Sequence, residues 1–287
     1  MQGAIILITL HKLIDVYNTM EKARILFVSQ EITPYLPESE IANIGRNLPQ
    51  GIQEKGKEIR TFMPRYGSVN ERRNQLHEVI RLSGMNLIID DTDHPLIIKV
   101  ASIQAARMQV YFIDNEDFFQ RKNTIADEQE QEFPDNDERA IFFARGVLET
   151  TKKLRWAPDI IHCHGWFTGF LPLYIKKAMH DDPHFANSKI VYSVYNDPFT
   201  SEWDKKIKEK VMIDGLKKND LAILNPANYT NFTKLAISLS DGIIQGSENI
   251  NPEILEYIQQ SKKPFLPHQQ EEEYIDAYND FYDKLLN

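Results

Sequence analysis

The alternation of short apolar runs with longer amphipathic segments is the feature that most constrains the fold of this chain. The apolar run at 23–29 predicts a buried strand, the segment 39–56 predicts a helix that closes at Gly56, and 58–63 predicts a second strand. A strand–helix–strand unit requires a right-handed crossover between parallel strands. Pro49 lies inside the helical segment and is predicted to kink or split it.

The same alternation returns in the second half of the chain. Between the two halves, closely spaced strand-like runs over 77–113 favour an antiparallel hairpin excursion. The sequence therefore predicts an α/β fold: a single Rossmann-like, doubly wound parallel sheet with a β-hairpin excursion and a returning carboxyl-terminal helix. Further strands are predicted at DIIHCH, KIVYSVY and DGIIQG, and further helices over 137–154, 166–179, 203–217, 228–239, 252–260 and about 270–286.

Length and composition narrow the class of protein. The chain has 287 residues, and we assign 20–287 to the Rossmann-like domain and 1–19 to an amino-terminal extension. A net charge of −9 argues against nucleic acid as a partner, because phosphate contacts need a basic face. No apolar run approaches the ~20 residues of a membrane span. Cys163 is the single cysteine, which excludes an internal disulfide and fits a cytoplasmic location.

The predicted sheet indicates where a ligand would bind. Open parallel sheets hold ligands beyond the carboxyl ends of their strands. The residues of interest therefore follow the strands, at 29–41, 64–67, 162–166, 195–199 and 245–249.

Four of the motifs near this edge resemble one family when they are taken in order. They are ILFVSQEITPYL with ANIGRNLP and MPRYG, then DNDERAIFFARGVLE, PDIIHCHGWFTGFLP and AISLSDGIIQGSENINPEI. Together they resemble the bacterial glycogen and plant starch synthases, glycosyltransferase family 5, over roughly residues 22–260. The resemblance implies one half of a GT-B fold, in which two Rossmann-like domains face each other. It also implies metal-free transfer of glucose from ADP-glucose to an α-1,4-glucan.

The resemblance also implies roles for single residues. His162, His164 and Asp135 match the positions expected to be catalytic. Two departures stand out, since Gly165 replaces the motif's aspartate and Tyr195 replaces a histidine. The positions expected to bind substrate are Trp166, Asn136, Arg139, Tyr195 and Asn196.

The stretch Pro37-Glu38-Ser39-Glu40 is a degenerate phosphate loop, because it stands where the family has Lys-Thr-Gly-Gly. Glycines let backbone N–H groups approach a diphosphate, and a lysine adds positive charge. Here a proline removes one donor and two glutamates add negative charge. Ser39 as an N-cap and Glu40 in the first turn explain the same residues as helix-starting ones. We therefore expect ADP-glucose to bind poorly or not at all.

The length of the chain after the resemblance is a further departure from the family. Fewer than thirty residues follow, whereas a nucleotide-binding domain needs ~100–150. We expect an internal loss of that domain, with a terminal helix at 270–286 whose aromatic stripe packs on the core. The surface left uncovered would favour a homo-oligomer or a partner chain.

The sequence His162-Cys163-His164 raises the question of a metal site. On a strand, the two imidazoles point to one face and the thiol to the other. Two ligands make an incomplete zinc site, so no metal or other cofactor is predicted. The imidazoles are expected to line the cleft, and Cys163 is expected to be buried and inert.

Two functions remain open from the sequence. The first is a glycogen or starch synthase-like protein of α-1,4-glucan biosynthesis, which would not act alone. The alternative is a non-catalytic glucan-binding, regulatory or scaffold protein. An α-glucan or oligosaccharide is the expected small partner in both. A folded relic with an unrelated role is a third, plainer interpretation.

Overall fold

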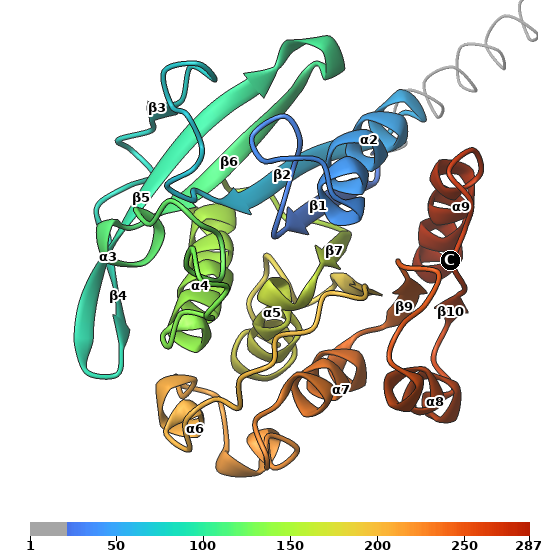
Figure 1. Cartoon of the computed structure of the whole chain (residues 1–287). Coiled ribbons are helices and arrows are strands. Elements are labelled where there is room, and N and C mark those ends of the chain that lie inside the picture. Colours follow the sequence, from blue (N-terminus) through green and yellow to red (C-terminus); the bar gives the residue numbers. More distant parts are fainter. Residues whose placement is uncertain (1–21) are drawn as a thin grey trace, which may run out of the picture.

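The computed structural model describes residues 22–287, so the predicted extension 1–19 lies outside the described residues. The described strands join in one sheet in the order β10-β9-β8-β7-β1-β2-β6-β5-β3, with β4 paired to β5 (Figure 1). The strands are β1 (Arg24–Ser29), β2 (Glu58–Pro64), β3 (His77–Glu78), β4 (Met85–Ile89), β5 (Thr92–Ile103), β6 (Met108–Asp114), β7 (Ile160–His164), β8 (Lys189–Val194), β9 (Gly242–Gln245) and β10 (Phe265–Leu266).

The directions of the strands confirm a doubly wound sheet with a hairpin excursion. Every neighbouring pair from β10 to β6 is parallel. The long strand β5 instead pairs antiparallel with β3, β4 and β6. Strands β2 and β6 follow β1 on one side of the sheet, and β8, β9 and β10 follow β7 on the other side. The order in which the chain adds strands therefore reverses between β1 and β7. Ligands bind at such a point in open α/β sheets.

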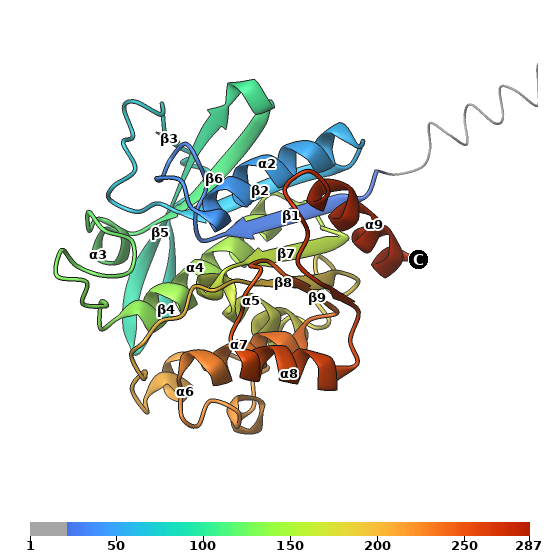
Figure 2. The same cartoon turned by 45° about the vertical axis from the view of Figure 1, so that its right-hand side comes forward.

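Helices cover both faces of the sheet (Figure 2). One face carries α2 (Glu40–Glu54) and α9 (Tyr274–Leu286), and the other carries α4 (Asn136–Lys153), α5 (Phe170–Leu173), α7 (Tyr229–Leu239) and α8 (Pro252–Ser261). Strand β1 shows why, because its alternate side chains enter different apolar clusters. Ile25 and Phe27 pack with the aromatic residues of α9, whereas Leu26 and Val28 join the larger cluster on the opposite face.

The aromatic stripe of α9 is core packing, as predicted. Tyr274, Tyr278, Phe281 and Tyr282 are each no more than 8% exposed. The approach to the sheet is close, since a Cβ on Gly242 of β9 would lie 2.9 Å from the Phe281 ring. The helix is therefore an integral part of one face of the domain.

Three helix predictions need correction. Helix α2 is not split at Pro49, because its packing on the sheet outweighs the lost backbone bond. The predicted helix 166–179 is divided into a 3-10 turn, α5 and a π turn around Pro172, which cannot donate a backbone hydrogen bond. The predicted helix 203–217 shrinks to α6 (Ile207–Lys210), and the φ of +94° at Gly215 excludes the end of the predicted range from a regular helix.

The segment between β6 and α4 contains a short helix, α3 (Glu116–Phe119), that the sequence did not indicate. Its Phe118 and Phe119 are buried. They pack around α4, where the Phe118 ring lies 5.4 Å from the Phe142 ring.

Candidate functional site

A hollow of about 380 Å³ lies at the carboxyl ends of β1, β7 and β8, beside the amino-terminal end of α2. This is the edge that the sequence pattern indicated, and it adjoins the switch point of the sheet. The hollow is lined by Gln30, Glu31, Ser39, Glu40, Ile41, Ile125, Trp166, Tyr195, Asn196, Asp197 and Pro198. No Lys, Arg or His is among these lining residues, whereas three of them are carboxylates.

The start of α2 is closed by the protein's own side chains. Ser39 is the N-cap, as predicted, and its Oγ accepts a hydrogen bond from the Ala42 N–H at 3.0 Å. The same hydroxyl donates to Glu31 Oε2 at 2.5 Å. Glu40 accepts a hydrogen bond from the Ser247 hydroxyl, which comes from the loop after β9. The capping hydroxyl and two carboxylates therefore stand where an anion would meet the helix end.

The first half of the degenerate loop lies away from this hollow. Pro37 and Glu38 are exposed and are not among its lining residues. Only Ser39 and Glu40 of the four loop residues reach the site.

The two histidines of β7 are buried, not open to the cleft. His162 and His164 are no more than 1% exposed, on the face that α9 covers, and Cys163 points into the opposite cluster, as predicted. The Tyr282 hydroxyl lies 2.6 Å from His162 Nδ1, and the Ser193 hydroxyl lies 2.7 Å from Nε2. Burial lowers the pKa of His164 to about 3 and takes the pKa of His162 well below its usual value. Both imidazoles are therefore neutral at pH 7.

Tyr195 connects the buried histidines to the hollow. Its hydroxyl lies 2.9 Å from His164 Nδ1, and the residue lines the hollow while being 1% exposed. Its neighbour Asn196 is exposed, and the Asn196 side-chain amide makes no hydrogen bond to another described residue. This amide is therefore available to a ligand.

Asp135, Asn136 and Arg139 lie at the start of α4 and outside the lining of the hollow. Asp135 receives a two-pronged ion pair from Arg121, with both N–O distances at 2.6 Å. Asn136 donates to the Ile125 carbonyl at 2.8 Å, and Ile125 forms part of the wall. Asn136 is therefore linked to the hollow through the loop that contains Ile125, and not by contacting the hollow itself.

Asp197 is a site residue that the motif comparison missed. Its carboxylate accepts hydrogen bonds from the Trp166 backbone N–H at 3.1 Å and from the Tyr229 hydroxyl at 3.2 Å. Burial raises the pKa of Asp197 to about 7. The available signal was position alone, because Asp197 falls in the stretch 195–199 that follows β8.

The pKa of Asp197 predicts a pH dependence of stability. Between the ordinary carboxyl value of 3.8 and about 7, the folded state holds a proton that the unfolded state has lost. The free energy of unfolding should therefore fall as the pH rises through this window. We expect Asp197→Asn to flatten that fall, as measured by urea unfolding of both proteins from pH 4.5 to pH 8. An identical slope in wild type and variant would contradict the assignment.

The turn after β7 depends on a glycine at position 165. Its backbone has φ 82° and ψ 161°, a conformation that is essentially restricted to glycine. A Cβ at this position would lie 2.3 Å from Oε1 of Gln30. That same Gln30 oxygen accepts a hydrogen bond from the Phe167 N–H at 3.2 Å. The Gln30 side chain therefore occupies the space that a side chain at 165 would need.

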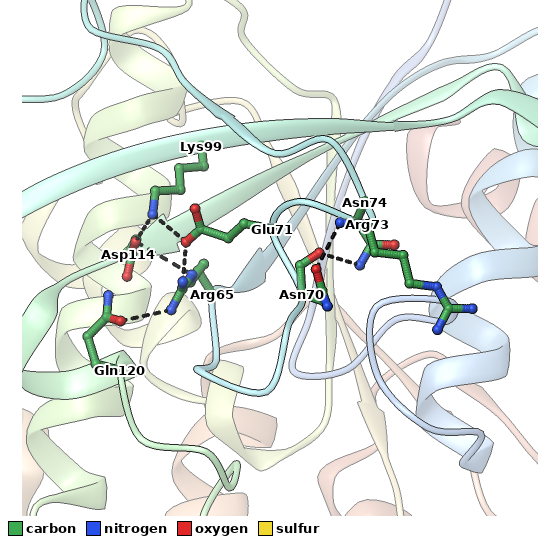
Figure 3. A network of polar contacts seen from close by, with 8 residues as sticks. All are labelled: Arg65, Asn70, Glu71, Arg73, Asn74, Lys99, Asp114 and Gln120. Atoms are coloured by element: carbon green, nitrogen blue, oxygen red, sulfur yellow. Dashed lines mark hydrogen bonds and ion pairs between the residues drawn. The ribbon is translucent and has the colours of Figure 1, made fainter.

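The carboxyl ends of β2 and β6 carry a charged network that Figure 3 shows. Lys99 Nζ lies 2.9 Å from Asp114 Oδ2 and 2.6 Å from Glu71 Oε1. Arg65 pairs with Glu71 and donates to Gln120 Oε1 at 3.2 Å. Two cations thus face two carboxylates, one of which, Asp114, is 1% exposed. These cations hold the loop after β2 in place and supply no uncompensated charge for an anionic ligand.

The fold and the site define a doubly wound α/β domain with a hollow beside the switch point of its parallel sheet. Residues 22–287 contain no helix long and apolar enough to cross a membrane. They also contain no cluster of three or more His, Cys, Asp or Glu side chains that could hold a metal ion. The chain belongs to the starch synthase catalytic domain family, which it matches over residues 24–263.

Relatives and a solved structure agree with this membership. The glycogen synthase of Chlorobium limicola is 38% identical over 174 residues, which cover 60% of this chain and 36% of that protein. The glycogen synthase of Chlorobaculum parvum is 34% identical over 200 residues, with coverages of 68% and 41%. The catalytic domain of starch synthase IV from Arabidopsis thaliana, bound to ADP and acarbose, has the same fold, with a TM-score of 0.69 at 19% identity over 87% of this chain and 52% of that one. The chain therefore spans less than half the length of these glycogen synthases.

Proposed function

We propose that this domain binds the end of a neutral α-glucan in the acid-lined hollow and does not transfer glucose from ADP-glucose on its own. The observation that carries the proposal is the acidic lining: Glu31 and Glu40 bring negative charge, Asp197 adds a third carboxyl group, and no Lys or Arg is among the lining residues. The single cysteine fits a cytoplasmic site of action.

The acidic lining opposes a nucleotide diphosphate. A carboxylate ~5 Å from one phosphate charge costs about 3 kcal/mol at an effective dielectric of ~20. Two glutamates at the helix end would therefore offset much of the roughly 8 kcal/mol that micromolar binding provides. Retaining glucosyl transfer also needs stabilisation of the leaving diphosphate, and no residue of this lining offers a positive charge.

The same lining suits a sugar. Carboxylate oxygens accept strong hydrogen bonds from hydroxyl groups, and the free Asn196 amide both donates and accepts. A neutral polyol thus offers hydrogen bonds to the acidic groups without adding a charge that they would repel.

Family membership favours a second candidate function. In this alternative, the domain supplies the glucan-holding half of an α-1,4-glucan synthase, and a separate chain supplies the half that binds ADP-glucose. Asp197, with a pKa near 7, would then be suited to proton transfer.

Calorimetric titration of the purified chain tests the proposal. We expect heat with maltoheptaose, no heat with millimolar ADP-glucose, and weaker maltoheptaose binding after Asn196→Ala. Binding of ADP-glucose, or silence with maltoheptaose, would refute the proposal. Glucose incorporation on adding a nucleotide-binding partner chain would favour the second candidate.

A further inference from the structure

We propose that a second sugar subsite lies between α2 and the segment that leads from β10 into α9, across Glu40 from the first hollow. The inference rests on the proposed glucan binding and extends it to a longer oligosaccharide. This second hollow has a volume of about 300 Å³.

Two asparagines give the second hollow the chemistry of a sugar site. Asn43 and Asn47 are four residues apart on α2, so they share one face of the helix. Both are exposed and line the hollow, and neither side chain makes a hydrogen bond to another described residue. Each amide offers two donors and one acceptor, which match the paired hydroxyls of a pyranose.

The opposite wall and the floor complete the hollow. Tyr274 and Tyr278 of α9 contribute ring surface, with 8% and 2% of each residue exposed. His268 fixes the connecting segment, because its Nδ1 lies 2.9 Å from the Gly246 carbonyl oxygen. This wall, from His268 onward, lies beyond the matched residues 24–263. The subsite is therefore built jointly by α2 and by the connection into α9.

A thin ridge separates the two hollows. Glu40 lines both, held by the Ser247 hydroxyl. Gly246 backs the second hollow and presses on Tyr195 of the first, since a Cβ at Gly246 would lie 2.4 Å from the Tyr195 ring. An oligosaccharide of several units can cross this ridge, whereas a disaccharide fills one side only.

The charge of the second hollow selects the same kind of ligand. Glu40 and Glu271 line it, and no Lys or Arg does. A neutral oligosaccharide is favoured over a phosphorylated one for the reason given for the first hollow.

The test compares maltose with maltoheptaose by calorimetry on three proteins. They are wild type, the double variant Asn43→Ala/Asn47→Ala, and the control Gln50→Ala. Gln50 lies on the same helix but borders a different hollow. We expect the double variant to bind maltoheptaose about tenfold more weakly, since two amide contacts are lost. Maltose affinity and the control should remain at wild-type values, and urea unfolding checks that the variants fold.

The outcomes separate the two proposals. Equal maltoheptaose affinity in wild type and the double variant would overturn the second subsite and leave the first hollow standing. An equal loss for maltose and maltoheptaose would also overturn it, because the asparagines would then serve the first hollow. Failure of wild type to bind maltoheptaose would overturn both.

Discussion

Replacing Tyr282 with alanine is expected to lower the free energy of unfolding by about 3–5 kcal/mol. The ring is fully buried between α9 and the sheet, 6.4 Å from the Phe27 ring. Its hydroxyl is also a hydrogen-bond partner of the buried His162 imidazole. The change leaves a cavity and an unpaired polar atom together, which urea unfolding at pH 7 would measure.

Two variants make the Tyr282 measurement specific. Tyr282→Phe keeps the ring and should cost only about 1–3 kcal/mol, the penalty for the lost partner of His162. Tyr257→Ala, on the partly exposed side of α8, should cost about 1 kcal/mol. A Tyr282→Ala protein as stable as the Tyr257→Ala protein would show that α9 contributes little to the domain.

Replacing Arg139 with alanine is expected to cost a similar amount, about 3–5 kcal/mol. The side chain is 0% exposed, and its guanidinium donates to the Phe118 carbonyl at 2.8 Å and to Asn136 Oδ1 at 2.6 Å. Burial lowers the pKa of Arg139 to about 10, so the group remains charged at pH 7. Aromatic rings surround the guanidinium at 5.2–5.9 Å, those of Tyr66, Phe119, Phe133 and Phe167.

The readout for Arg139 must separate a structural role from substrate binding. Arg121→Ala removes a partly exposed guanidinium nearby and should cost less than about 1 kcal/mol. If the folded Arg139→Ala protein binds maltoheptaose as wild type does, the residue acts through packing. A loss of binding with unchanged stability would instead support the substrate contact that the family resemblance implies.

Local sequence patterns predicted much of the fold. The continuous apolar run Ile25, Leu26, Phe27 and Val28 predicted a buried strand, and the structure puts these side chains into two opposite clusters. The aromatic spacing of α9 likewise predicted its packing, and Ser39 predicted the start of α2. These features depend on residues that are close in sequence, so hydrophobic periodicity and helix-capping rules can predict them.

The site was less predictable because its contacts join distant segments. Ser247 reaches Glu40 across 207 positions, and Tyr282 reaches His162 across 120. The edge of the sheet followed from strand order, but the burial of His162 depends on where α9 crosses that sheet. The raised pKa of Asp197 depends on its burial beside Trp166 and Tyr229. The spacing of these residues in the sequence does not predict that burial.

The packing of Gln30 against Gly165 determines which side chains position 165 can accept. A single change to aspartate at 165 would bring a clash with Gln30 and a forbidden backbone angle, not a working carboxylate. At least a second change, at position 30, would have to accompany it, together with a shift of the turn. The side chains that position 165 tolerates therefore depend on the residue at position 30, which couples the turn after β7 to the residue that follows β1.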